Sequence, residues 1–117
     1  MVKITPVKVS GAFHTVHMQP AQEAFRRALE KVTWLPGNLC SYSNVTGQPY
    51  TKEDNMVDLL VRQLCEPVKW NCILNDIMEK FDNKKLTKLI EIGPGRQLKT
   101  MVGKVNRRAV RFTENVT

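Results

Sequence analysis

His14 is the residue of this 117-residue chain that is best placed for proton transfer. It lies in segment 10–15 (SGAFHT), which follows a predicted strand end at 7–9 and precedes a predicted helix that begins at His17. Loops at strand ends are where α/β folds place ligands and catalytic groups. Histidine ordinarily titrates near neutral pH, which suits a general base. On this pattern alone a surface or loop-capping histidine is the more common outcome, and catalysis is the functional alternative.

No serine or cysteine of the sequence is an evident nucleophile for His14. The sequence has no Gly-x-Ser-x-Gly, and none of its serines (Ser10, Ser41 and Ser43) has the surroundings of a nucleophile elbow. A pairing of His14 with a cysteine stays open, but all three cysteines fall in predicted strand or helix interiors, which is typical of buried, inert thiols. They are Cys40, Cys65 and Cys72, an odd set without a C-x-x-C pair, which favours a reducing compartment.

Neither a metal nor a phosphate site is expected. His17 lies three residues after His14, but zinc needs three or four ligands, and the cysteines are distant and unpaired. Segment 93–96 (GPGR) lies between a predicted strand and a predicted helix, where free amides and Arg96 could bind an anion. It matches neither phosphate-binding glycine motif, so the sequence favours a tight turn over an anion site.

The charge of the chain is strongly basic, at +7 with a pI near 9.6. The basic residues are spread thinly except for Arg107, Arg108 and Arg111 near the end. Aromatic residues are scarce and do not alternate with the basic ones, so no nucleic acid is expected as a partner. No apolar run approaches the roughly 20 residues of a membrane-spanning helix, so no membrane partner is expected either.

The apolar pattern predicts alternating strands and helices. The predicted elements, in order, are a strand end at 7–9, a helix over 17–32, a strand over 39–43, a helix capped by Thr51 and Asp54 that breaks at Glu66, a helix from Pro67 to Phe81, a strand over 86–92, a helix over 98–105 and a strand over 109–112. This alternation predicts an α/β layered fold with mainly parallel strands and about four helices. About four short strands make a small sheet, so the sequence is interpreted as a piece of a larger one.

The predicted core lies on the inner faces of these helices and strands. The third helix has the cleanest amphipathic pattern, and its predicted inward face consists of Trp70, Ile73, Leu74, Ile77, Met78 and Phe81. The apolar positions of the strand over 86–92 are also expected to be buried.

Four segments together, in this order and spacing, resemble the malonyl-CoA:acyl-carrier-protein transacylase family. They are 9–15 (VSGAFHT), 43–47 (SNVTG), 60–64 (LVRQL) with 67–70 (PVKW), and 90–95 (IEIGPG). The resemblance runs from about Val7 to about Val105 and corresponds to the last third or so of a full family member. It implies the C-terminal portion of an α/β-hydrolase-like domain. Residues 1–10 would end a strand of a small inserted ferredoxin-like subdomain, and residues 11–117 would belong to the large acyltransferase subdomain.

The resemblance also implies roles for individual residues. His14 would be the general base that activates a serine, and the main-chain carbonyl of Gln63 would orient it in place of the acid of a usual triad. Phe13 matches a position that carries phenylalanine in members selective for malonyl, where its bulk would exclude a substituent on the acyl α-carbon. The nucleophile, the oxyanion hole and the arginine that binds the malonyl carboxylate would all belong upstream, so this chain alone is expected to be inactive.

The implied reaction moves malonyl from coenzyme A, through a serine ester, to the phosphopantetheine thiol of acyl carrier protein, in fatty acid synthesis. It implies malonyl-CoA and acyl carrier protein as partners and no cofactor. Acyl carrier protein is acidic, so the basic residues Lys104, Arg107, Arg108 and Arg111 are docking candidates, although a solvated basic surface is favoured. Segments 43–47 and 95–98 look closer to the animal mitochondrial type, which suggests the mitochondrial matrix, with the cytoplasm as the alternative. The alternative function is an inactive truncated module that binds acyl carrier protein or another chain.

Overall fold

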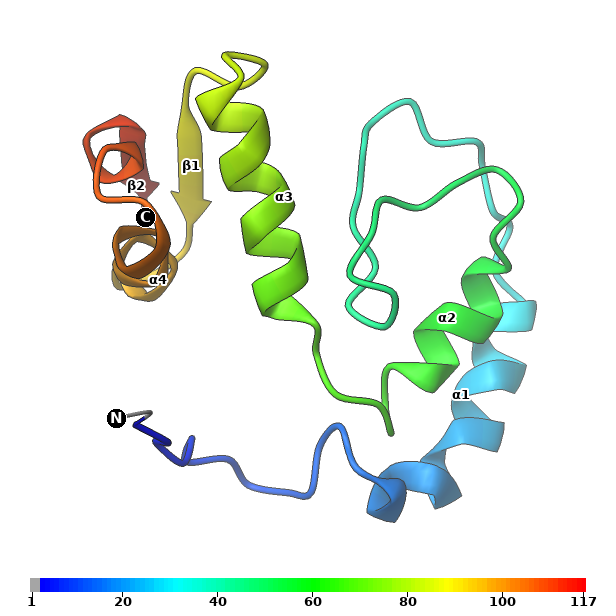
Figure 1. The fold of residues 1–117 in the computed structure, drawn as a ribbon. Coiled ribbons are helices and arrows are strands. Elements are labelled where there is room, and N and C mark those ends of the chain that lie inside the picture. Colours follow the sequence, from blue (N-terminus) through cyan, green and yellow to red (C-terminus); the bar gives the residue numbers. More distant parts are fainter. Residues whose placement is uncertain (1–2) are drawn as a thin grey trace. The chain divides into compact units, whose positions relative to one another are not determined.

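The computed structural model describes residues 3–117, and the chain divides into two compact units between Lys69 and Trp70. The first unit contains α1 and α2 and the loops around them, and the second contains α3, β1, α4 and β2 (Figure 1). None of the helices formed by residues 3–117 is long and apolar enough to cross a membrane.

The first unit begins with an extended segment, a 3-10 turn and the helix α1. A 3-10 turn over Val16–Met18 leads directly into α1, Gln19–Glu30, with Pro20 in its first turn, as the apolar spacing predicts. The predicted strand end at 7–9 is wrong: residues 3–9 form no regular element, and their side chains are exposed. An extended segment becomes a strand only when a neighbouring strand accepts its hydrogen bonds, and none in the described chain pairs with it.

The second helix, α2, runs over Met56–Arg62 and is shorter than predicted. Its cap is Asn55, whose side chain accepts a hydrogen bond from the amide of Asp58 at 2.9 Å. The predicted cap at Thr51 is therefore wrong for this helix: the Asp54 carboxylate does accept the Thr51 amide at 2.8 Å, as in a capping box, but within a turn that precedes the helix. Pro67 was also misplaced by the sequence prediction, since it lies in the segment between α2 and α3.

The predicted strand over 39–43 is reduced to a single antiparallel bridge between Tyr42 and Pro49. Between these two residues the chain turns back on itself through the five-residue segment 43–47, which we call the Ser43 turn. The amide of Gly47 donates to the Ser43 carbonyl at 2.9 Å, and Gly47 itself has a positive φ of 71°. The bridge is formed by two main-chain bonds on either side of Pro49, in which the amide of Ser43 donates to the Gln48 carbonyl at 2.9 Å and the amide of Tyr50 to the Ser41 carbonyl at 2.8 Å.

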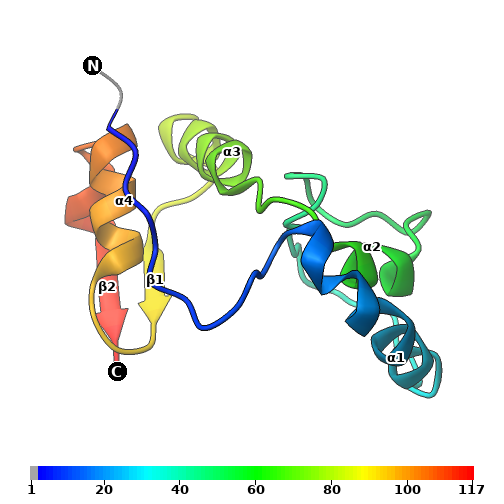
Figure 2. The ribbon, with the colours of Figure 1, turned by 90° about the horizontal axis from the view of Figure 1, so that it is seen from below.

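The second unit is a parallel strand pair with helices packed on it. It consists of α3, Trp70–Asp82; β1, Leu89–Ile92; α4, Gln97–Val105; a 3-10 turn, Ala109–Phe112; and β2, Thr113–Val116. The two strands pair in parallel with Leu89 opposite Thr113 and Ile92 opposite Val116, and α4 forms the connection between them (Figure 2). A helix that joins two parallel strands is the defining unit of α/β folds, so the predicted fold class is confirmed.

The core of the second unit lies between α3, α4 and the 3-10 turn. Its buried members are Leu74, Met78, Val102 and Ala109, and the partly buried side chains packed against them are Trp70, Ile77, Phe81 and Leu89. The α3 residues of this core all belong to its predicted inward face, and the remaining member, Ile73, is also buried, so that face is confirmed. The ring of Phe81 also lies against that of Phe112, with centroids 5.5 Å apart in a tilted arrangement.

Two predictions about the strands of the second unit are wrong. In β1 the apolar residues Ile90 and Ile92 are 57% and 83% exposed, whereas Glu91 is buried. Successive strand residues point to opposite faces, and the face of Glu91 is the one that meets α4. The predicted strand over 109–112 is a 3-10 turn instead, because Asn106 caps it through the amides of Arg108 and Ala109, and the strand begins only at Thr113.

Candidate active site

The loop that carries His14 has an unusual backbone conformation. His14 has a φ of 61°, in the left-handed region that side chains other than glycine seldom adopt. The next residue, Thr15, stabilises the loop on both sides, since its hydroxyl donates to the Ala12 carbonyl at 2.7 Å and accepts from the His17 amide at 3.3 Å. A left-handed residue costs about 1–2 kcal/mol, so other contacts must hold His14 in place.

Two successive main-chain carbonyls at the end of α2 provide those contacts. The ring Nδ1 of His14 lies 2.8 Å from the carbonyl oxygen of Gln63. The amide nitrogen of His14 donates to the carbonyl of Leu64 at 2.9 Å. A carbonyl oxygen can only accept, so Nδ1 carries the hydrogen and Nε2 is left free to accept a proton when the ring is neutral. The exposed ring of His14 therefore has a fixed tautomer and an available base nitrogen.

The carbonyl of Gln63 is free to accept because of its place in the chain. Gln63 is the C-cap of α2, and the last four carbonyls of an α-helix have no donor within the helix. After it, the chain forms a short turn in which the amides of Cys65 and Glu66 bond to the Arg62 carbonyl. Helix geometry thus leaves the Gln63 oxygen exposed for a side chain that is 49 residues away in sequence.

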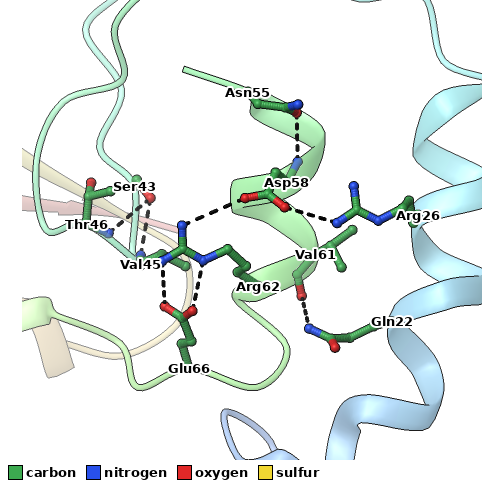
Figure 3. A network of polar contacts seen from close by, with 10 residues as sticks. All are labelled: Gln22, Arg26, Ser43, Val45, Thr46, Asn55, Asp58, Val61, Arg62 and Glu66. Carbon is green, nitrogen blue, oxygen red and sulfur yellow. Dashed lines mark hydrogen bonds and ion pairs between the residues drawn. The ribbon is translucent and has the colours of Figure 1, made fainter. Parts of the chain in front are cut away.

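A polar network ties α2 to α1 and to the turn after it (Figure 3). Asp58 bonds to Arg26 of α1 at 3.1 Å and lies 3.8 Å from Arg62, and Arg62 bonds to Glu66 through both carboxylate oxygens, at 2.8 and 3.3 Å. Gln22 of α1 donates to the carbonyl of Val61 at 3.2 Å. These contacts fix the end of α2, which carries the His14 acceptors, to the helix that follows His14.

Arg62 keeps its positive charge in this network at any accessible pH. Its hydrogen bond to Glu66 raises the pKa of its guanidinium above the ordinary value, and the charges of Glu66 and Asp58 act in the same direction. Its side chain is 44% exposed, so each of its ion pairs contributes little free energy of unfolding, at most about 1 kcal/mol. The network supplies geometry more than stability.

Phe13 lies directly beside His14, with a side chain that is 48% exposed. Its ring lies over Gly11, where an added Cβ would come within 3.5 Å of the ring. The phenylalanine ring therefore borders the same loop as the base nitrogen. The role of Phe13 stays a prediction.

The four basic docking candidates lie near the end of the second unit, and all are exposed. Lys104 belongs to α4 and borders an open hollow with Arg96, Gln97, Thr100 and Met101. Arg108 differs from the others because it forms an ion pair with Asp82 at 2.8 Å. Part of the positive charge is therefore neutralised within this unit.

The cysteines are more exposed than predicted, and Ser43 is a buried turn residue. Cys40 and Cys72 are exposed and Cys65 is half-buried, so the prediction of buried thiols is wrong. Cys40 lies in a loop because the predicted strand does not form, and Cys72 lies on the outer side of α3. Ser43 is buried, and its hydroxyl accepts from the amides of Val45 and Thr46, so it is a turn residue.

The tight turn at segment 93–96 is confirmed, and the amides just beyond it have a partner within the chain. Gly93 and Gly95 have φ values of 124° and 86°. The first amides of α4 are already occupied, because the Glu91 carboxylate accepts from Leu98 at 2.8 Å and from Lys99 at 3.1 Å. Sequence reasoning missed this role of Glu91, and the local pattern of 89–92 carries no signal for it. Among residues 3–117, no group of three His, Cys, Asp or Glu side chains could hold a metal ion.

The comparisons with known proteins point to one class of enzyme. No family model matches the chain. The chain is 38% identical over 108 residues to a protein of Drosophila melanogaster described as a probable malonyl-CoA-acyl carrier protein transacylase, mitochondrial. The matched region is 92% of this chain and 28% of that protein. The chain thus spans less than a third of the length of this curated relative.

Solved structures give the same result for the fold. The malonyl CoA-acyl carrier protein transacylase of Clostridium perfringens matches 94% of this chain and 33% of its own with a TM-score of 0.78 at 36% identity. A malonyl-transacylase in complex with its type II polyketide-synthase acyl carrier protein matches 94% of this chain and 33% of its own with a TM-score of 0.73 at 28% identity. The similarity therefore extends to mitochondrial and bacterial proteins of the same description.

Proposed function

We propose that this chain is the C-terminal segment of an acyltransferase that moves malonyl from coenzyme A to acyl carrier protein, and that it supplies the catalytic histidine. Its similarity to part of the malonyl-CoA–acyl carrier protein transacylases supports this proposal. The observation that carries this proposal is the 2.8 Å contact between Nδ1 of His14 and the Gln63 carbonyl. It is the arrangement that a base needs when no carboxylate orients it.

The proposed chemistry uses His14 as a base and then as an acid. Nε2 takes the hydroxyl proton of a serine as its oxygen attacks the thioester carbonyl of malonyl-CoA. The imidazolium then gives that proton to the departing coenzyme A thiolate, which leaves a malonyl-serine ester. The same steps in reverse order pass malonyl to the phosphopantetheine thiol of acyl carrier protein and restore the serine.

The Gln63 carbonyl would stabilise the positive ring between these two proton transfers. Its oxygen accepts from Nδ1 in both protonation states, so the ring keeps its orientation while Nε2 gains and loses the proton. The left-handed backbone of His14 supports this assignment, since strained residues cluster at functional sites. No cofactor enters any step.

Specificity and partners follow from the same proposal. Phe13 would exclude acyl groups with a substituent on the α-carbon, and exposed Lys104, Arg107 and Arg111 would attract an acidic carrier protein. The carrier-protein complex of a similar enzyme supports this class of partner. Mitochondrial relatives support the mitochondrial matrix as the location.

The 117 residues alone are proposed to be inactive, because they contain no Gly-x-Ser-x-Gly and a positioned base without a nucleophile has no covalent route. This same observation favours the second candidate function, a non-catalytic module that binds acyl carrier protein or another chain. Incubation of the chain with labelled malonyl-CoA is expected to leave no labelled protein.

A chimera tests the enzyme proposal directly. The matching segment of the Drosophila relative is replaced by residues 7–117 of this chain, and transfer of labelled malonyl to holo acyl carrier protein is measured. The chimera is expected to be active, and His14→Ala is expected to lower kcat by at least about a hundredfold, as for loss of a general base. His17→Ala, three residues away and exposed, is the matched control and is expected to have no effect. A folded chimera in which His14→Ala is as active as the parent would refute the proposal.

A further inference from the structure

The Ser43 turn is held by two buried residues and by its own hydrogen bonds. Ser43 and Val45 are only 1% and 2% exposed, and they are the largest fully buried side chains of the described chain. The Ser43 hydroxyl accepts from the amides of Val45 and Thr46, which closes the turn from within (Figure 3). A turn whose anchoring residues are buried keeps the residue between them, Asn44, in a fixed place.

Asn44 uses that fixed position to hold the segment that follows α2. Its side-chain amide donates to the side-chain oxygen of Gln63 at 3.2 Å. Its main-chain carbonyl accepts from the amide of Lys69 at 2.9 Å. One residue therefore holds both ends of segment 63–69, which contains the carbonyls that bond to His14.

The bond to Gln63 is the one that matters for the base. The Gln63 carbonyl lies at the end of a seven-residue helix, where its peptide is held within α2 by one bond, from the amide of Leu64 to the carbonyl of Val61 at 3.2 Å. Because the Gln63 side chain is tied to Asn44, a displacement of Gln63 that carries its carbonyl away from His14 would strain this second bond. A carbonyl that turns away from Nδ1 releases the ring, and a small misplacement of a catalytic group is costly.

We propose that Asn44 is a positioning residue: by holding the Gln63 side chain, it keeps the Gln63 carbonyl against Nδ1 of His14 and so fixes the tautomer of the base. The catalytic meaning of this step rests on the proposed function above. The positional claim itself concerns only contacts within the first unit, so it can be tested without activity.

The test reads the tautomer of His14 in the 117-residue chain. Long-range ¹H–¹⁵N spectra at about pH 8.5, about two units above the ordinary histidine pKa, distinguish a ring protonated at Nδ1 from one protonated at Nε2. His17 serves as the internal reference, since it is exposed and its ring has no hydrogen-bond partner within residues 3–117. The wild-type His14 is expected to carry its hydrogen on Nδ1, and His17 is expected to show the mixture of a free imidazole.

Asn44→Leu keeps the size of the side chain and removes the donor. It is expected to lower the Nδ1–H to Nε2–H ratio of His14 about fivefold, which corresponds to about 1 kcal/mol, the worth of one neutral hydrogen bond. Asn44→Asp is expected to restore the wild-type ratio, because the Gln63 amide can turn over and donate to the new carboxylate. Gln63→Leu, which retains the main-chain carbonyl, is expected to reproduce Asn44→Leu, and the double variant to change nothing further.

Thr46→Val is the matched control. It weakens the same turn by removing the bonds between the Thr46 hydroxyl and Gln48, but it leaves the Asn44 amide untouched. Its His14 ratio is expected to equal that of the wild type. The proposal is overturned if Asn44→Leu leaves the His14 ratio unchanged in a folded chain, or if Thr46→Val shifts it equally.

Gln63→Leu and the chimera separate the remaining outcomes. If Asn44→Leu does not fold, Gln63→Leu carries the same test, and an unchanged His14 ratio there overturns the proposal. An inactive chimera with the expected tautomer shifts would refute the proposed function and support the positioning role. An active chimera without those shifts would support the proposed function and refute the positioning role of Asn44.

Discussion

Glu91 is expected to be the most important polar side chain for the stability of the second unit. It is only 8% exposed, and its two carboxylate oxygens accept the amides of Leu98 and Lys99, at 2.8 and 3.1 Å. Both amides lie in the first turn of α4, where no helix carbonyl can reach them. The carboxylate also lies at the positive end of the helix dipole.

The magnitude follows from these two bonds. A hydrogen bond to a charged group contributes about 1.5–3 kcal/mol and a neutral one about 1 kcal/mol, and the dipole term adds about 0.3–1 kcal/mol. Glu91→Gln keeps one acceptor oxygen but loses the charge and the second bond, and the lower desolvation of a neutral group offsets part of that loss. We expect Glu91→Gln to lower the free energy of unfolding by about 2 kcal/mol and Glu91→Leu, which leaves both amides without an acceptor, by about 3 kcal/mol.

Amide hydrogen exchange combined with urea unfolding measures this effect. In Glu91→Gln, one amide of the pair Leu98 and Lys99 is expected to exchange faster than in the wild type. In Glu91→Leu, both amides are expected to exchange faster. Glu114→Gln is the control, because Glu114 lies on β2 in an ion pair with Lys88 and its side chain is 61% exposed. Its effect is expected to stay within about 0.5 kcal/mol. If Glu91→Gln is equally mild and both amides exchange as before, the capping role of Glu91 is refuted.

The remaining predictions concern glycines and are read by thermal or urea unfolding. Gly93→Ala and Gly95→Ala are each expected to lower the free energy of unfolding by about 1–2 kcal/mol through backbone strain alone, because both glycines have a positive φ and an added Cβ would meet nothing within 4 Å. Gly37 is equally open but has no positive φ, so Gly37→Ala is the control and is expected to be neutral. Equal effects at all three positions would contradict this prediction. Gly103→Ala gains up to about 1 kcal/mol of helix propensity, but its Cβ would lie 3.0 Å from Cγ2 of Val110. It is therefore expected to raise the free energy of unfolding only when Val110→Ala removes that contact. If the effects of the two substitutions simply add, the clash is excluded.

The helices were the part of the fold that the sequence predicted best. The three long ones, α1, α3 and α4, each carry an apolar stripe at helical spacing, and their observed bounds fall within two or three residues of the predicted ones. The start of α2 was harder to predict. Thr51 and Asn55 are both good caps, and only the geometry of the preceding turn decides that Thr51 and Asp54 bond to each other while Asn55 bonds to the helix.

The strands were predicted less well, because strand formation depends on partners that a local pattern does not contain. Residues 3–9 and 39–43 have strand-like composition but no ladder neighbour in the described chain. In β1 the burial of Glu91 in place of Ile90 follows from the helix N-terminus that lies over it, a contact made after the next turn of the chain. Composition gave no sign of this inversion.

The candidate site shows the same division. The position of His14 in a loop before a helix was visible in the sequence, but no spacing rule connects it to Gln63, which lies 49 residues away. That contact was implied by the resemblance alone. The second carbonyl, that of Leu64, and the left-handed backbone of His14 were not predicted by either route.

A main-chain acceptor changes where such a site is vulnerable. A carboxylate that orients a histidine can be lost by one substitution, whereas the Gln63 carbonyl remains present in every substitution of Gln63, including Gln63→Leu, which only loosens it. Sensitivity must therefore pass to the side chains that hold the end of α2: Asn44 on Gln63, Gln22 on the Val61 carbonyl, and Arg62 on Glu66. Each of these contacts is weak in free energy, at about 1 kcal/mol or less, so their loss is expected to loosen the base while leaving the chain folded.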